Sequence, residues 1–393
     1  MPPRPSLPGI FLAALRLGCT SFGGPVAHLA YFRAEYVVKR RWLDEAHYAD
    51  LVALCQFLPG PASSQTGFGI GYELRGPAGG LAAWLGFTLP SALLMLGFAH
   101  GVASLGVTGP TGWLQGLKVA AVAVVAQAVW AMGRTLCPDW PRRALALAAA
   151  GLVLWLPGAW SQLAVLGLGA LFGWGFLRAP GTAPVPATTA GHRKTGAVCL
   201  GLFGLLLGLL PVAARLTADP RLEIFDRFYR AGALVFGGGH VILPLLEREV
   251  VAPGWLTPDQ FLAGYGAAQA LPGPLFSLGA YLGAVMGHGP GGWGGGLWAL
   301  LAIFLPGLLL VAGVLPFWQT LRTRPGAQAA LRGANATVVG VLLAAFCQPV
   351  CTAGLVDGRT VALAVAGFIA LQSGRIPAWA VVTAAAGLGA LLL

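Results

Sequence analysis

Two glycine motifs occupy matching places in the two halves of this chain. The first reads Phe22–Gly23–Gly24 and the second reads Phe236–Gly237–Gly238–Gly239, so their numbers differ by a fixed offset (236 − 22 = 214). Glycines remove side chains where two helix ends could meet, and a helix N-terminus presents unpaired N–H groups with about half a positive charge. Such an arrangement suits an anion. The alternative is that the glycines only allow two helices to pack closely.

Two proline–glycine–proline motifs repeat with almost the same offset. Pro59–Gly60–Pro61 returns as Pro272–Gly273–Pro274 (272 − 59 = 213). Two prolines around a glycine cannot continue a helix, because N–H donors are missing and the rings clash with the preceding turn. The freed backbone groups are available to a ligand or to water, unless the motif is only a structural kink. Neutral side chains near the motifs extend this candidate substrate site: Ser21, Gln56, Ser63, Ser64, Gln65, Gln269 and Ser277.

Two arginines lie inside apolar segments at equivalent positions. Arg16 and Arg230 have the same offset as the glycine motifs (230 − 16 = 214). A cation at the centre of a membrane helix costs on the order of 3 kcal/mol, so it normally faces a cavity or a partner. We therefore expect these arginines to attract an anionic substrate. Because their segments are short, snorkelling to the membrane interface is an equal alternative.

Four titratable side chains are candidates for proton coupling. Glu35 and Glu249 are equivalent (249 − 35 = 214), and they could pair with the two arginines or take up a proton during transport. His28 and His240 are further candidates because histidine changes charge near neutral pH, although neither has a histidine at its matching position. Plain interfacial carboxylates and satisfied buried histidines are the alternatives.

The composition indicates that these residues are positioned by membrane helices. The chain is 57% hydrophobic and 9% charged, with a mean hydropathy of +0.76. Its 59 glycines and 29 prolines lie within apolar runs, as in membrane helices, which argues against disorder. The net charge of +11 comes from basic residues scattered at segment ends, so we expect no nucleic-acid partner. The lipid bilayer is the expected environment.

Cofactor and catalytic motifs are not found in the sequence. The six cysteines have no paired CxxC spacing, so we expect buried thiols rather than a metal site. A nucleotide-binding loop of the form GxxxxGK[ST] and the hydrolase motifs HExxH and GxSxG are also missing. We therefore expect no metal, no cofactor and no enzymatic activity.

The expected fold is an all-α integral membrane protein of two homologous helical repeats. We predict a first repeat at 1–178, a cytoplasmic linker at 179–195 and, at 196–393, a linking transmembrane helix followed by the second repeat. Apolar pieces flanking the motifs are shorter than the roughly 20 residues of a full span, which predicts broken or re-entrant helices there. Non-helical backbone at membrane depth must face protein or a wet cavity, so the breaks should face the substrate path.

Basic residues indicate that the two repeats lie upside down to each other. Lys39–Arg40–Arg41 in the first repeat matches the uncharged Val251–Gly254, whereas Arg322 and Arg324 match the uncharged Val107–Trp113. If basic loops are cytoplasmic, the repeats have inverted topology. The same rule predicts a cytoplasmic N-terminus.

The repeated motifs resemble those of the chromate ion transporter family in its long two-domain form. The resembling stretches of the first half are Thr20–Pro25, Arg41–Leu43 and Gln56–Pro61, and those of the second half are Leu234–Gly239, Leu245–Val250, Gly254–Thr257 and Gln269–Pro274. The chain departs from the family pattern at Ala62, where asparagine is common, and at Ala270–Leu271, where a polar residue is expected.

The resemblance implies a secondary transporter of the bacterial inner membrane that exports chromate, a tetrahedral dianion, using the proton motive force. Expelling two negative charges from a negative interior yields roughly 4–5 kcal/mol per 100 mV. We expect the anion to bind between the four helix breaks, with alternating access produced by rocking of one repeat against the other.

Other functions stay open at the level of sequence. The same scaffold could carry sulfate or another oxyanion, since sulfate shares the charge and shape of chromate. A more distant alternative is a membrane enzyme or a lipid-handling scaffold, against which the missing catalytic motifs argue. The sequence does not fix the number of subunits, and a homodimer is one arrangement that it allows.

Overall fold

The described part of the chain is entirely helical and forms two compact units. A computed structural model describes residues 5–104, 112–156, 159–177, 193–235, 242–318 and 324–392, and these contain no β-strand. One unit comprises 1–108, 187–239 and 267–317, and the other comprises 109–186, 240–266 and 318–393. Each unit therefore takes segments from both halves of the sequence. Of the predicted linker, 179–192 lie outside the described residues, and the boundaries of the two repeats stay a prediction.

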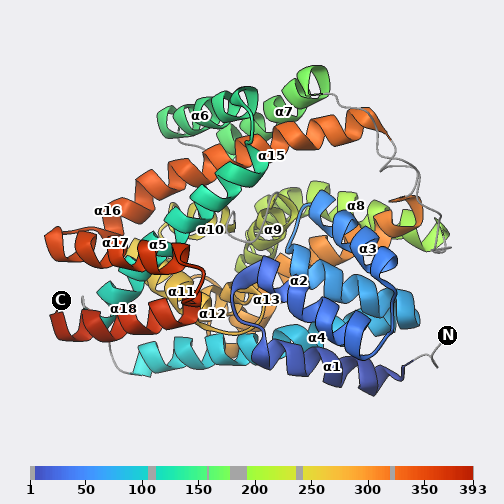
Figure 1. Ribbon diagram of the computed structural model, residues 1–393, viewed down its shortest axis with the longest axis horizontal. Coiled ribbons are helices and arrows are strands. Elements are labelled where there is room, and N and C mark those ends of the chain that lie inside the picture. The colour runs from blue at the N-terminus through green and yellow to red at the C-terminus, as the bar shows by residue number, and fades with distance from the viewer. Residues whose placement is uncertain are drawn as a thin grey trace. The chain divides into compact units, whose positions relative to one another are not determined.

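The first unit holds both Pro-Gly-Pro motifs and the helices around them. Its helices from the first half are α1 (Leu7–Thr20), α2 (Gly24–Phe32), the π-helix η1 (Arg33–Lys39), α3 (Glu45–Phe57) and α4 (Ala62–Ser104). Those from the second half are α8 (Arg193–Thr217), α9 (Pro220–Ala233), the 3₁₀ turn η3 (Leu275–Ser277), α12 (Leu278–Val285), α13 (Gly292–Val314) and the 3₁₀ turn η4 (Leu315–Phe317). Helix α1 packs along α4, and its counterpart α9 packs along α13 (Figure 1).

Helix α4 is interrupted where a third motif repeats. Its backbone leaves the helical region at Arg75 and Gly76, and Gly76 has φ +63°. The counterpart, Gly289, has φ +83° in the loop between α12 and α13. Both belong to one pattern, since Arg75–Gly76–Pro77 returns as His288–Gly289–Pro290 at the offset of the Pro-Gly-Pro motifs (288 − 75 = 213). Glycine is needed here because positive φ is costly for other residues.

In the second unit, helices from the first half of the sequence pack against helices from the second half. Its helices are α5 (Gly112–Leu136), α6 (Trp140–Trp155), α7 (Ala159–Phe176), α10 (Ile242–Val250), most of α11 (Pro258–Ala270), α15 (Pro325–Ala345), the π-helix η5 (Phe346–Cys351), α16 (Thr352–Gly354), α17 (Gly358–Gln372) and α18 (Ala378–Leu392). Helix α15 packs against α6 and α7, whereas α5 packs against α17 and α18 (Figure 1). Each long helix is therefore covered by the terminal helix pair of the other half.

Glycines make both of these exchanged contacts close. A side chain added at Gly116 of α5 would overlap the carbonyl oxygen of Ala385 on α18. A side chain at Gly333 of α15 would likewise overlap the carbonyl oxygen of Gly169 on α7, next to Gly173. Small residues that let helix backbones approach are the typical packing device of membrane helices.

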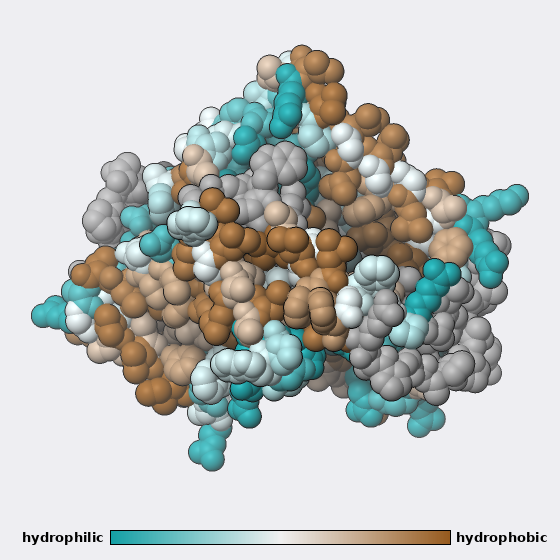
Figure 2. All heavy atoms as spheres, turned by 90° about the horizontal axis from the view of Figure 1, so that it is seen from above, coloured by the Kyte–Doolittle hydropathy of each residue, from teal (hydrophilic) through white to brown (hydrophobic). Residues whose placement is uncertain are grey.

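The apolar helices are those of a multi-pass membrane protein. Five of the described helices are long and apolar enough to cross a bilayer, within Ala62–Gly101, Gly112–Leu136, Arg193–Thr217, Gly292–Phe317 and Pro325–Gly354. In α8 only 6% of the apolar window is buried, so most of its side chains point outward. Hydrophobic residues cover much of the face drawn in Figure 2. Leu216 and Leu391 are examples of apolar side chains on the surface, and each is 81% exposed. A surface of this kind is suited to lipid.

Candidate functional site

The two Pro-Gly-Pro motifs are hydrogen-bonded reciprocally to the segments that precede the two glycine motifs. The Gly60 N–H donates to the carbonyl oxygen of Val235 at 2.6 Å, and the Gly273 N–H donates to that of Ser21 at 2.9 Å. Ser21 and Val235 are equivalent positions (235 − 21 = 214), as are the two glycines. Each repeat therefore donates one backbone hydrogen bond to the other at the same place. The motif Phe236–Gly239 itself lies outside the described residues.

Glycine is required at the centre of both Pro-Gly-Pro motifs. Helices α3 and α11 end at Phe57 and Ala270, just before the prolines, as the missing N–H donors demand. Gly60 has φ +125° and Gly273 has φ +97°. An added Cβ at Gly273 would also lie 2.9 Å from Ser91 Oγ, so neither the backbone conformation nor the space admits a side chain.

Two helices, and the 3₁₀ turn that leads into α12, begin at these motifs. Helix α2 begins at Gly24 after Gly23, which has φ +98° and offers no side-chain cap. Helix α4 begins at Ala62 directly after Pro61, and η3 begins at Leu275 after Pro274 without a side-chain cap. The first N–H groups of a helix have no partner within it, so these ends carry partial positive charge. The sequence prediction of helix breaks at these three motifs agrees with these bounds.

Buried polar atoms gather in the same unit without hydrogen-bond partners among the described residues. They are Ser21 Oγ, Ser64 Oγ, Gln65 Oε1, Thr88 Oγ1, Trp84 Nε1 and Gln269 Nε2. Leaving a buried polar group unpaired costs about 1–3 kcal/mol, so such groups mark places where water or a ligand binds. The Gln65 amide nitrogen, by contrast, donates to the carbonyl oxygens of Pro59 at 2.8 Å and Gly307 at 3.2 Å.

The polar side chains of this region come mainly from the first repeat. Ser21, Ser63 and Gln65 correspond to Val235, Phe276 and Leu278. On α4, Thr88 and Ser91 correspond to Phe304 and Gly307 of α13, at an offset of 216. The two repeats thus share a backbone arrangement but not its polar groups. Thr88 and Ser91 were missed by the sequence analysis, because single hydroxyls inside a long apolar helix carry no distinguishing pattern.

The other predicted site residues have varied surroundings. His28 is buried, with its Nδ1 3.2 Å from Ser63 Oγ and its ring edge-on to Phe87. The Ser277 hydroxyl donates to the carbonyl oxygen of Pro274 at 2.8 Å, whereas Gln56 is exposed. His240 lies outside the described residues.

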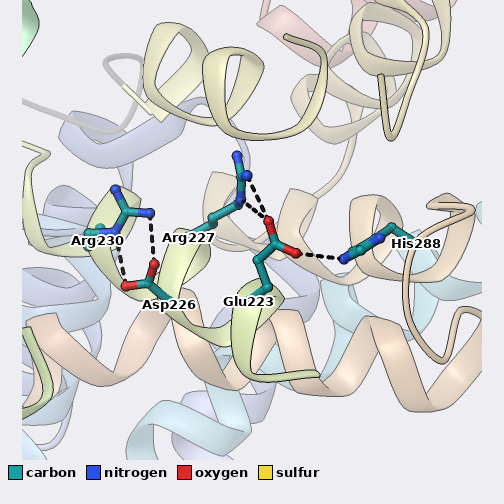
Figure 3. A network of polar contacts seen from close by, with 5 residues as sticks. All are labelled: Glu223, Asp226, Arg227, Arg230 and His288. Atoms are coloured by element: carbon teal, nitrogen blue, oxygen red, sulfur yellow. Dashed lines mark hydrogen bonds and ion pairs between the residues drawn. The ribbon is translucent and has the colours of Figure 1, made fainter. Parts of the chain in front are cut away.

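The two predicted arginines differ in their partners. Arg16 is exposed on α1, and no ion pair of its side chain is found in the described ranges. Arg230 is half-buried on α9 and donates to both carboxylate oxygens of the buried Asp226, at 3.0 and 2.8 Å (Figure 3). The position equivalent to Asp226 is Leu12, which explains the difference.

One of the predicted glutamates, Glu35, pairs with basic residues that follow it closely in the sequence. Glu35 is buried and accepts hydrogen bonds from Arg40 at 2.7 Å and from Lys39 at 3.2 Å, which are basic residues of the following turn. The pairing of Glu35 with Arg16 that the sequence allowed is therefore replaced by a local one. Glu249 is half-buried in α10.

A charged face of α9 was also missed by the sequence analysis. Glu223 accepts a hydrogen bond from Arg227 at 2.8 Å, and its other oxygen lies 3.0 Å from His288 Nε2 (Figure 3). The spacing of Glu223, Asp226, Arg227 and Arg230, at steps of three and four residues, places all of them on one helix face. That spacing was a readable signal. In the part of the chain that the structure describes, no cluster of three His, Cys, Asp or Glu could hold a metal ion.

Comparison with known proteins gives a consistent assignment. The profile of a family described as Chromate transporter matches residues 9–174 and 222–390. A chromate transport protein of Pseudomonas aeruginosa is 30% identical over 372 residues, covering 87% of this chain and 80% of that protein. A probable chromate transport protein of Synechococcus elongatus is 28% identical, covering 84% and 81%. An uncharacterized transporter of Methanocaldococcus jannaschii is 26% identical, covering 87% and 84%.

No solved structure matches this chain. Each matched region contains one glycine motif and one Pro-Gly-Pro motif. The resemblance inferred from those motifs is confirmed, and the chain belongs to the chromate transporter family.

Proposed function

We propose that this protein is a secondary transporter that exports chromate across the bacterial inner membrane, driven by the proton motive force. Family membership and the names of the relatives support chromate as the substrate. The observation that carries the proposal is the reciprocal pair of hydrogen bonds, Gly60 to Val235 and Gly273 to Ser21, with unpartnered buried polar atoms in the same unit.

Recognition of the dianion rests on helix ends and neutral donors. The N-termini of α2, α4 and η3 supply partial positive charge, and the hydroxyls of Ser21, Ser64 and Thr88 together with the Gln269 amide supply hydrogen bonds. Neutral donors compensate the dianion without holding it as tightly as a buried cation would. A carrier benefits from this because it must also release its substrate. Arg16 then attracts the anion from a distance, whereas the charge of Arg230 is compensated by Asp226.

Access to the site alternates between the two sides of the membrane. Inverted repeats that rock against each other provide such a change, and the helix breaks are the points at which their arms can move. The reciprocal hydrogen bonds join backbone to backbone at the break, so they can act as a pivot that both states keep. In this proposal the N-terminus is cytoplasmic and the site residues are those of the four motifs and their neutral neighbours.

The first test measures chromate movement by the purified protein. In proteoliposomes we expect counterflow of chromate, and in everted vesicles we expect accumulation that a protonophore abolishes. Excess sulfate should compete weakly if chromate is the substrate and fully if the protein is a sulfate carrier. Absence of movement of either anion would reject a carrier function, and a change in lipid composition would instead support a lipid-handling protein.

A further inference from the structure

The third repeated motif makes the same kind of contact in both repeats, but with different chemistry. In the first repeat, Arg75 Nε donates to the carbonyl oxygen of Pro5, just before α1, at 2.9 Å. In the second repeat, the equivalent His288 lies with Nε2 3.0 Å from a carboxylate oxygen of Glu223, in the first turn of α9 (Figure 3). Each contact links the segment around the shared Gly-Pro to the beginning of the first helix of the same repeat. In the first repeat this is the break of α4 and a residue just before α1, and in the second it is the loop after α12 and the first turn of α9. We call these two contacts the joints of the two repeats.

Only the second of these joints can change its charge near neutral pH. Arginine is always protonated in proteins, whereas histidine is the side chain that gains or loses its charge between pH 5 and 8. A protonated His288 forms an ion pair with the Glu223 carboxylate, whereas a neutral His288 keeps at most a hydrogen bond to that carboxylate. Protonation therefore adds the attraction between two opposite charges to the contact and tightens it.

The charged groups around Glu223 keep it ionised. Arg227 binds its other oxygen, and the Asp226–Arg230 pair occupies the next turn of α9 (Figure 3). Burial acts to raise the pKa of Glu223, but the hydrogen bonds from Arg227 and His288 outweigh it and lower that pKa.

The helices packed around this joint contribute little that could titrate in its place. Helix α13, which packs on α9, contains no titratable side chain, and that of α12 is the buried Tyr281. Helix α8 carries its basic residues only at its ends, as Arg193, Lys194 and Arg215, besides the apolar-embedded thiol of Cys199. Helix α4 packs on α12 and α13 and carries another histidine, His100, whose Nδ1 lies 3.0 Å from the Leu96 carbonyl oxygen and whose ring centroid lies 5.6 Å from that of Trp293 on α13. His288 is the histidine that contacts Glu223.

Glu223 and His288 each lie in a segment that leads along the chain to a motif of the proposed substrate site. Helix α9 leads from Glu223 through Ala233 to Val235, which accepts the hydrogen bond of Gly60. Helix α12 leads from the Pro272–Gly273–Pro274 motif, through η3, to the loop that holds His288. Gly289 of that loop packs directly on Ile224 of α9. A change in the His288–Glu223 contact therefore acts on both motifs of the second repeat.

We propose that His288, paired with Glu223, takes up and releases the proton that drives the transport cycle. The inference rests on the proposed proton-driven export of chromate. The step is a simple protonation: the neutral imidazole accepts one proton from the aqueous phase and becomes imidazolium, and deprotonation returns it. The ion pair favours the protonated ring, so uptake of the proton tightens the contact between His288 and Glu223 and its release loosens that contact.

The test separates substrate movement from proton coupling. Purified variants are reconstituted in proteoliposomes that contain a pH-sensitive dye, and chromate counterflow is measured beside chromate accumulation driven by a pH gradient. We expect His288→Gln and His288→Arg to keep counterflow within about threefold of the unmodified protein. Both should lose at least about tenfold of the pH-driven accumulation and the accompanying proton signal. Arg75→Gln, the matched control in the first repeat, should keep both activities coupled.

Glu223→Gln gives an independent readout. Without its anionic partner the protonated imidazole loses an ion pair, so the pH of half-maximal flux should move to a lower value than in the unmodified protein. If His288→Gln also loses counterflow, His288→Arg decides, because a permanent cation restores the contact but cannot release a proton.

Two results overturn the inference, and one overturns the proposed function instead. Proton-coupled accumulation by His288→Arg at the unmodified rate would exclude His288 as the coupling group. If the unmodified protein exchanges chromate without any proton signal, the role of His288 in proton coupling is rejected, but the protein is still a chromate carrier. Absence of chromate counterflow in the unmodified protein would reject the proposed function itself.

Discussion

At the scale of single residues, the two repeats have the same backbone breaks but different side chains. The unpartnered hydroxyls of Ser21, Ser64 and Thr88 belong to the first repeat, and the positions equivalent to Ser21 and Thr88 hold Val235 and Phe304. A doubly negative substrate bound in this unit would find these hydroxyl donors in the first repeat only. We therefore expect substrate affinity to be sensitive to changes in the first repeat.

Removal of the Thr88 hydroxyl should weaken chromate binding. Thr88→Val keeps the side-chain shape and deletes an unpartnered hydroxyl, so we expect KM for chromate to rise about tenfold, equivalent to about 1.4 kcal/mol, with little loss of stability. Thr66→Val on the same helix is the matched control, because the Thr66 hydroxyl is already bonded to the Ala62 carbonyl oxygen. An equal rise of KM in both variants would show that Thr88 has no special contact with the substrate.

At the scale of helices, the second unit is held by an exchange of partners. Helix α15 lies against α6 and α7, and α5 lies against α17 and α18 (Figure 1). Gly333 with Gly169 and Gly173, and Gly116 with Ala385 and Gly389, allow the backbones to approach. Packing of small residues replaces the hydrophobic effect, which is weak between helices in lipid.

A bulky side chain at the α7–α15 contact should destabilise the second unit. We expect Gly173→Leu to lower the unfolding free energy by about 1–3 kcal/mol or more, because its Cβ would overlap the Ala329 carbonyl oxygen on α15. Gly175→Leu on the same helix meets open space and serves as the control. Thermal unfolding in detergent measures both. Similar melting temperatures for the two variants would contradict the close α7–α15 contact.

At the scale of the whole molecule, each compact unit requires both halves of the sequence. The helix ends at the Pro-Gly-Pro motifs could be predicted: α3 ends at Phe57 and α11 at Ala270, just before the prolines. Apolar runs and proline or glycine breakers determine these ends locally. The exchange of helices between halves could not be predicted, because it depends on contacts between residues far apart along the chain.

The candidate site could be predicted from the sequence in part: its repeated motifs were found, and several of its single side chains were not. The motif residues were found because they repeat, and the reciprocal bonds of Gly60 and Gly273 support their grouping in one unit. Thr88 and the His288–Glu223 pair were missed, since their neighbours in space follow from tertiary packing. The shared Gly-Pro of Arg75–Gly76–Pro77 and His288–Gly289–Pro290 would have directed attention to His288.

Separately expressed halves should function only together. We expect residues 1–178 and 193–393, produced as two chains, to restore chromate transport when co-expressed and to be degraded when produced singly. Each half alone would leave helix faces without the partners that the other half supplies. Chromate resistance of cells and membrane abundance of each chain measure the result. Transport by one half alone would contradict the shared units.

The crossed backbone bonds have a consequence for how the gene can change. In each repeat, the residue before the glycine motif and the glycine of the Pro-Gly-Pro motif both bond to the other repeat. The number of residues between these two points is therefore constrained by the two hydrogen bonds together. The two copies differ by one residue over this stretch, and an insertion of several codons between Ser21 and Gly60 would disturb both crossings, even though only one repeat would be longer. Length variation should therefore accumulate in the connector between the repeats, while the stretch from glycine to proline motif stays nearly equal in the two copies, as the offsets of 214 and 213 already show.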